Sequence, residues 1–188
     1  NIDKPVEGLE TDVVHELEVQ REAIPLVFVP GFMGTCLRLK GTDGTGKGPD
    51  GLPNLRWNPS DKITWLAPHF LWRKGVTRKA MLVGKRFNPD YLEPNNAKPP
   101  NSGLAALMQD YYETFLIPLR DVGWGPLHKI FEFPVYAFGY NWTDDAKHSG
   151  ELLADRILKI IAEANDVVGY CRKVILITHS MGGLVSRW

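Results

Sequence analysis

The sequence predicts an α/β fold with a mostly parallel β-sheet and helices on both faces. Three short apolar runs, residues 24–30, 133–139 and 173–178, have the length expected of buried strands. Segments with helical spacing of apolar residues separate these runs, and this alternation is typical of parallel sheets. With 188 residues, of which 44% are hydrophobic and 23% charged, the chain can bury a sizeable core.

Residues 1–23 are expected to form an N-terminal extension ahead of one domain at 24–188. Residues 1–20 are polar and acidic and lack the basic start and apolar stretch of a secretory signal. No window holds the run of about 18 apolar residues that a membrane-spanning helix needs. The sequence therefore leaves the localisation unknown and export open.

The first apolar run ends in Pro30 and Gly31, which indicates a buried strand that leads into a loop. Residues 41–100 are interpreted as an insertion between this strand and its helix. Glycines and prolines are frequent from residue 40 to residue 60 and indicate a flexible excursion there. Because the insertion is too long for an ordinary connection, we expect it to serve the function.

An amphipathic helix is expected after the insertion. Asn101 or Ser102 can cap it, and it should end near Pro118 or Gly123. Its apolar face is expected to comprise Leu104, Leu107, Met108, Tyr111, Tyr112 and Phe115.

A second amphipathic helix is expected to start near Glu151, and Asp145 or Ser149 is suited to cap it. Its apolar face should comprise Leu152, Leu153, Ile157, Ile160, Ile161 and Ala164. Asp144, Asp145 and His148 lie close together and carry triad-type side chains. They precede the third apolar run, however, so we favour capping over catalysis.

The third apolar run leads into Thr178-His179-Ser180-Met181-Gly182, which reads as a strand end, a tight turn and a helix start. In such a nucleophile elbow the turn strains the serine backbone and lifts its hydroxyl clear of the sheet. Gly182 stands where strand and helix approach too closely for a side chain, whereas Thr178 replaces the usual Gly. Ser180 is the predicted nucleophile. His179 should point away from the apex and either pack or form a hydrogen bond.

A second motif, Pro30-Gly31-Phe32-Met33-Gly34-Thr35, follows the first apolar run. In hydrolases with a serine elbow, the loop at this place donates a backbone N–H to the oxyanion hole. Attack by the serine converts the substrate carbonyl into an alkoxide, and removing one such donor typically costs about 3–4 kcal/mol. We expect the N–H groups of Phe32 and Met181 to form the hole. For the loop alone, a simple turn is the alternative.

Several segments together resemble the lecithin:cholesterol acyltransferase-like lipases. Residues 24–39 are similar to that family's opening strand and its Pro-Gly-x-x-Gly-Ser/Thr-x-Leu loop. Residues 115–124 and 133–142 are similar to its helix ending in Leu-x-x-x-Gly-Tyr and its strand ending in Tyr-Asp-Trp-Arg. The elbow resembles its Ala/Gly-His-Ser-Met-Gly, and the order of the segments is consistent over residues 24–39 and 104–188.

The resemblance implies an α/β-hydrolase that cleaves fatty-acyl esters of lipids, with Ser180 as nucleophile and Phe32 and Met181 as oxyanion hole. Water would release the fatty acid from an acyl-enzyme, whereas an alcohol acceptor would make the protein an acyltransferase. The sequence departs from the family at Asn141 and Thr143, where the family has Asp and Arg. An ion pair is therefore not expected at that corner.

A lipid substrate suggests that the insertion 41–100 is a lid. Its aromatic side chains could cover an acyl pocket in water and open in transient contact with a membrane surface, while basic residues meet phosphate head groups. The candidate lid and substrate-binding residues are Trp57, Trp65, Phe70 and Trp72, followed by the basic residues Arg73, Lys74, Arg78 and Lys79. The alternative is a satellite core under a long loop, and only the location favours function.

The charge balance and the spacing of histidines and cysteines argue against other classes of function. Lys+Arg and Asp+Glu both number 22, so nothing indicates nucleic-acid binding. His69 and His128 lack partners at metal-ligand spacing, so no metal and no cofactor are expected. Cys36 and Cys171 are interpreted as two buried free thiols, with a disulfide as the alternative. A protein partner is unknown from the sequence.

The catalytic triad of this architecture runs in the chain order Ser, then Asp or Glu, then His. We therefore expect the protein to continue beyond Trp188 and residues 1–188 alone to be inactive. Two alternatives stay open: a catalytically incomplete hydrolase-fold module that interacts with another protein, and a thioesterase or peptidase on the same fold.

Overall fold

The computed structural model describes residues 21–39, 56–57, 87–89 and 104–188, and the statements below concern these residues. Its strands are β1 (Glu22–Ala23), β2 (Leu26–Val29), β3 (Leu37–Leu39), β4 (Arg56–Trp57), β5 (Phe87–Pro89), β6 (Phe131–Glu132), β7 (Val135–Ala137) and β8 (Ile175–Thr178). Its helices are η1 (Leu104–Ala106), α3 (Gln109–Asp121), η2 (Gly125–Lys129), α4 (Ala146–Val168) and α5 (Met181–Val185), of which η1 and η2 are 3₁₀ helices.

The central sheet has three parallel strands in the order β7–β2–β8. Leu26 pairs with Val135 on one side and with Ile175 on the other. The three apolar runs supply these strands, which confirms the α/β class with a mostly parallel sheet. None of the described helices is both apolar enough and long enough to cross a membrane.

The strands are shorter than the apolar runs that predicted them. Pro25 and Pro30 flank β2, and Pro134 precedes β7. Proline has no N–H to donate to a neighbouring strand, so it sits where the ladder ends.

Two smaller sheets flank the central one. β1 pairs with β6 in parallel, and β3 lies between β4 and β5 in an antiparallel sheet. β4 and β5 belong to the insertion 41–100, and Trp57 pairs with Leu37 through the backbone. The flexible excursion expected over residues 40–60 stays a prediction, and within it the structure describes only the pairing of Arg56 and Trp57 with β3. A strand pairing between distant segments leaves no local signal in a glycine-rich sequence.

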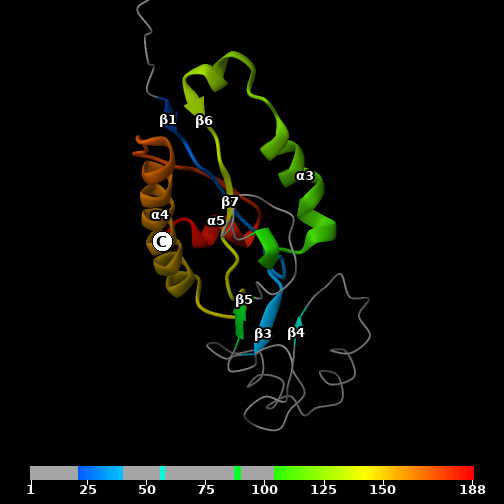
Figure 1. Ribbon diagram of the computed structural model, residues 1–188. Coiled ribbons are helices and arrows are strands. Elements are labelled where there is room, and N and C mark those ends of the chain that lie inside the picture. The colour runs from blue at the N-terminus through cyan, green and yellow to red at the C-terminus, as the bar shows by residue number, and fades with distance from the viewer. Residues whose placement is uncertain (1–20, 40–55, 58–86, 90–103) are drawn as a thin grey trace, which may run out of the picture.

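Helices lie on both faces of the central sheet, with α3 and α4 on opposite sides (Figure 1). They leave β8 largely exposed, in contrast to the buried β2 and β7. Because side chains alternate along a strand, Val27 and Val29 of β2 face one cluster and Leu26 and Phe28 the other. The first cluster includes Tyr136, Leu153, Ile160 and Val185. The second includes Leu104, Leu107, Tyr112, Leu116, Val135 and Ala137.

The helix expected after residue 102 begins later, at Gln109. The chain before it is held by the loop that follows β2, since Cys36 N–H donates to Ala106 O at 2.7 Å and Met108 N–H donates to Gly34 O at 3.1 Å. These bonds use backbone groups that a longer helix would need. The proposed caps at Asn101 and Ser102 lie outside the described residues.

The apolar face of α3 is rotated from the predicted one. Tyr112 and Leu116 are buried, whereas Tyr111 is 56% and Phe115 46% exposed. α3 passes through Pro118 and ends at Asp121. The pattern showed an apolar stripe, but the packing partner decides which part of the stripe is covered.

α4 starts at Ala146, before the expected Glu151, and Asp145 caps it by accepting a hydrogen bond from the Lys147 N–H at 2.9 Å. Leu153, Ile160 and Ala164 are buried as expected, but Leu152 is 46% exposed. The two cysteines, Cys36 and Cys171, are buried free thiols, which confirms that prediction.

Candidate active site

Ser180 lies at a sharp turn between β8 and α5. Its φ of 50° and ψ of −120° lie outside the regions that residues with side chains favour, and its side chain is exposed. Such a conformation costs of order 1–3 kcal/mol and persists only where its surroundings hold it. Here His179 N–H donates to Val29 O at 3.0 Å, while Gly182 and Gly183 N–H donate to the carbonyls of His179 and Ser180.

Gly182 brings α5 against the end of β2. A Cβ built on Gly182 would lie 2.6 Å from the carbonyl oxygen of Pro30 and closer still to that of Val29. Only glycine fits there without a shift of the backbone. Thr178, which replaces the usual Gly, is exposed at the end of β8.

The glycine loop, residues 30–35, lies directly against this turn. A Cβ built on Gly31 would be 3.1 Å from Ser180 Cβ and 2.8 Å from His179 Nδ1. The loop closes on itself because Gly34 N–H donates to Gly31 O at 3.0 Å. Within it Met33 adopts φ of 60°, a second strained residue beside the turn.

Buried side chains hold the glycine loop from behind. Thr35 is fully buried; its Oγ1 accepts from Tyr140 N–H at 3.2 Å and its carbonyl from Trp142 Nε1–H at 2.9 Å. The Tyr140 hydroxyl donates to Pro30 O at 3.0 Å. Burial raises the pKa of Tyr140, so its phenol stays a neutral donor.

Tyr112 of α3 reaches the same loop from the other side. Its hydroxyl accepts from Gly31 N–H at 3.1 Å and lies 3.0 Å from His179 Nδ1. The pKa of Tyr112 is raised, mainly by burial and against the lowering effect of the Gly31 N–H. The expected hydrogen bond of His179 is therefore present.

Phe32 and Met181 are the two residues whose backbone N–H groups are the predicted oxyanion donors. Among the residues that the structure describes, neither Phe32 N–H nor Met181 N–H has a hydrogen-bond acceptor. Met181 is the first residue of α5, where N–H groups lack partners within the helix. The Phe32 ring is 59% exposed and contacts Trp142 edge-on at 4.9 Å between centroids. Two N–H groups without an acceptor among the described residues thus lie on the glycine loop and on α5, the two segments that meet at Ser180.

The chain turns after β7 at Asn141 and Thr143, where the lipase family that the sequence resembles has Asp and Arg. Hydrogen bonds hold this corner. Asn141 Oδ1 accepts from Thr143 N–H at 3.1 Å and from its hydroxyl at 2.7 Å. This side-chain pair turns the chain toward α4.

The remaining candidates fall elsewhere. His148 Nε2 is 4.0 Å from Asp144 Oδ2 in the first turn of α4, where the neighbouring Asp145 acts as cap. Trp65, Phe70 and Trp72 lie outside the described residues, as does the side chain of Trp57. Within the described part of the chain, no three His, Cys, Asp or Glu side chains are grouped to hold a metal ion.

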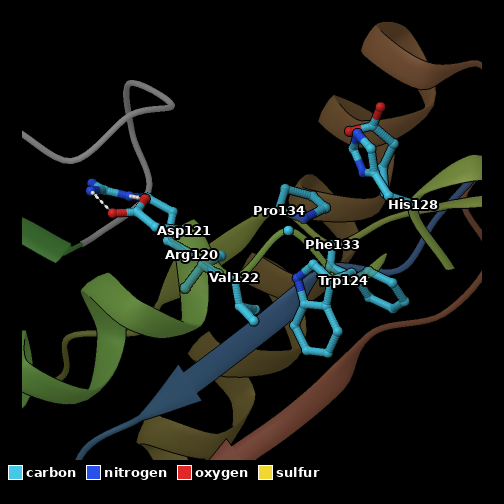
Figure 2. Close-up of a pocket in the computed structure, with 10 residues that line it drawn as sticks. Arg120, Asp121, Val122, Trp124, His128, Phe133 and Pro134 are labelled. Carbon is cyan, nitrogen blue, oxygen red and sulfur yellow. Dashed lines mark hydrogen bonds and ion pairs between the residues drawn. The ribbon is translucent and has the colours of Figure 1, made fainter. Parts of the chain in front are cut away.

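A hollow of about 260 Å³ lies at the start of β7, the end of the parallel sheet opposite to Ser180. Figure 2 shows the rings of Trp124 and Phe133 side by side, the Arg120–Asp121 ion pair at one end and His128 at the other. The hollow is separate from the elbow and does not enter the chemistry of Ser180.

Three residues that hold the glycine loop were not predicted to take part: Tyr112, Tyr140 and Trp142. Tyr112 was predicted only as an apolar helix residue, and its hydroxyl carried no local signal. The two aromatic residues after β7 were noticed as part of the family resemblance. The sequence did not show that they bind the loop 30–35.

Comparison with solved structures identifies a fold relative. A chain in the crystal structure of the Tle4–Tli4 complex matches with a TM-score of 0.62 and 22% sequence identity, over 88% of this chain and 42% of that one. At this identity the likeness shows a common fold, and the chain spans less than half the length of its neighbour. No protein-family model and no curated protein matches the sequence.

Proposed function

We propose that residues 24–188 carry the nucleophile and the oxyanion hole of a serine hydrolase that cleaves fatty-acyl esters of lipids. The strongest support is the strained, exposed Ser180 at the junction of β8 and α5, facing a glycine loop. Strained backbone at an exposed nucleophilic side chain is typical of catalytic turns.

In the proposed reaction, Ser180 Oγ attacks the ester carbonyl carbon and transfers its proton to a histidine base. The carbonyl oxygen becomes an alkoxide that accepts hydrogen bonds from Phe32 N–H and Met181 N–H. Collapse breaks the ester C–O bond, and the departing alcohol takes the proton from the histidine. Water then hydrolyses the acyl-enzyme, or a second alcohol accepts the acyl group.

A lipid substrate is supported by the family resemblance and by the exposed ring of Phe32 beside the elbow. An apolar side chain next to the reacting carbonyl suits an acyl chain better than a polar one. The proposed lid role of Trp57, Trp65, Phe70 and Trp72 stays a prediction.

The test is labelling of the full-length protein with a fluorophosphonate probe, which reacts only with an activated serine. We expect labelling of the wild type, loss in Ser180→Ala, and unchanged labelling in Ser186→Ala. Ser186 is a matched control because it caps the C-terminal end of α5, where its hydroxyl donates to the Gly182 carbonyl. Labelling that persists in Ser180→Ala would overturn the assignment. Release of fatty acid from phospholipid vesicles, compared with thioester and amide substrates, then tests the substrate class.

A second candidate is a non-catalytic module that binds another protein. Its support is that the fold relative was solved as a complex of two proteins. An unlabelled, well-folded wild type in the same experiment would favour this module over the enzyme.

A further inference from the structure

We propose that Tyr112 is a positioning residue of this site, whose hydroxyl sets the glycine loop against the nucleophile turn. The inference rests on the proposed function, because it assigns Tyr112 a role in the same reaction. It names a residue on α3 that the sequence marks only as apolar.

The Tyr112 hydroxyl is inserted between the two segments. It accepts from Gly31 N–H at 3.1 Å and lies 3.0 Å from His179 Nδ1. A Cβ built on Gly34 would be 2.7 Å from the same oxygen, so the turn 31–34 wraps around it. The hydroxyl therefore contacts both ends of the loop and the residue that precedes Ser180.

The Tyr112 hydroxyl and His179 Nδ1 form one hydrogen bond, whose direction depends on the His179 tautomer. A tyrosine hydroxyl has one proton to donate and accepts through its oxygen lone pairs. The oxygen can therefore accept from Gly31 N–H and either donate to an unprotonated Nδ1 or accept from an Nδ1–H. In both cases Nδ1 of His179 is bonded to Tyr112.

The Tyr112 hydroxyl bridges Gly31 and His179, and each of these residues immediately precedes a residue of the proposed reaction. Gly31 precedes Phe32, whose N–H is a proposed oxyanion donor, and His179 precedes Ser180. The hydroxyl thus controls how far the donor stands from the nucleophile. Displacements of about 1 Å at a catalytic geometry can reduce the rate about 100-fold.

The Tyr112 ring is itself fixed by the core. It is 5% exposed and packs edge-on against Phe28 of β2 at 4.8 Å between centroids. Since β2 also leads into the glycine loop, the ring and the loop share one rigid support. Removal of the hydroxyl alone leaves this packing in place.

The first experiment compares Tyr112→Phe with the wild type in the full-length protein, using p-nitrophenyl butyrate as substrate. We expect kcat per labelled site to fall about 10- to 100-fold, with KM within about twofold, because oxyanion contacts act in the transition state. Tyr111→Phe is the matched control: the ring of Tyr111 contacts Tyr112 and His179, so the change keeps these contacts and removes only a hydroxyl. We expect no change in kcat. Fluorophosphonate titration counts active sites, so partial unfolding does not imitate a loss of kcat.

A double-mutant cycle tests the bridge itself. His179→Leu removes the hydrogen-bond partner of the hydroxyl, and we expect the double variant with Tyr112→Phe to be little worse than either single variant, because both break one connection. His179→Gln, whose side-chain amide can donate and accept, should restore part of kcat. Should Tyr112→Phe not fold, the difference in kcat between His179→Leu and His179→Gln tests the positioning role.

The experiments distinguish failure of the positioning role of Tyr112 from failure of the proposed function. An active wild type whose Tyr112→Phe variant retains full kcat, or a strictly additive cycle, overturns the positioning role alone. Labelling that persists in Ser180→Ala overturns the proposed function, and the positioning role falls with it.

Discussion

Replacement of Gly182 by Ala is expected to destabilise the junction between α5 and β2. The added Cβ would meet the carbonyl oxygens of Val29 and Pro30, the latter at 2.6 Å. These are backbone atoms of the central strand, so no side-chain rotation relieves the contact. The Val29 oxygen also accepts the His179 N–H at 3.0 Å, a bond that a shift of the strand would weaken.

Comparison with the adjacent Gly183 separates the expected change in stability into a helix-propensity part and a steric-clash part. A Cβ there would lie 3.5 Å from Thr178 Oγ1, an ordinary contact. Either glycine gains up to about 1 kcal/mol in helix preference on change to Ala. Overpacking at Gly182 costs about 3 kcal/mol, the upper part of the usual range, because backbone must move. We expect Gly182→Ala to lose about 2 kcal/mol net and Gly183→Ala to gain up to about 1 kcal/mol.

The assay is urea unfolding of the full-length protein, followed by fluorescence and circular dichroism. The difference between the two alanine variants cancels the helix term and leaves the clash, about 3 kcal/mol. Equal stability of the two variants would refute the close approach of α5 to β2 and, with it, the observed geometry of the Ser180 turn.

Two further predictions concern the residues behind the glycine loop. Thr35→Val should cost about 1–3 kcal/mol, because it leaves the Tyr140 N–H buried without its acceptor; Thr35→Ser keeps the oxygen and should cost less, which urea unfolding of both variants checks. Burial raises the pKa of Tyr140 above its ordinary value, so above about pH 10 the unfolded chain loses a proton that the folded chain retains. Stability should then fall by at most about 1.4 kcal/mol per pH unit from this group. In Tyr140→Phe that part of the slope between pH 9 and 11 should vanish, and an unchanged slope would contradict the burial effect.

The sheet and the elbow could be predicted because their signals are local. The runs 24–30, 133–139 and 173–178 are short, rich in apolar residues and each followed by a turn, and all three became parallel strands. The cap of α4 by Asp145 was predictable for the same reason, since capping involves residues close in the chain.

Long-range contacts explain what the sequence did not show. Leu152 and Phe115 carry the helical spacing of core residues yet stay half exposed, because the neighbouring element covers a narrower stripe. Trp57 lies opposite Leu37 on a strand that depends on pairing between distant residues. The bond between Tyr112 and His179 joins residues 67 positions apart, and neither residue type signals the other.

The strain at the site and the bonds that hold it have similar magnitudes. Met33 and Ser180 each cost of order 1–3 kcal/mol in their positive-φ conformations. The loop is held by a hydrogen bond that Tyr112 accepts from Gly31 N–H and by bonds that Tyr140 and Trp142 donate, each worth about 1 kcal/mol net. No one bond balances the strain, so loss of any one should relax the site before it unfolds the chain. Variants of these three residues should therefore reduce kcat more than their effect on stability suggests, and a strict proportion between the two losses would argue against a preorganised site.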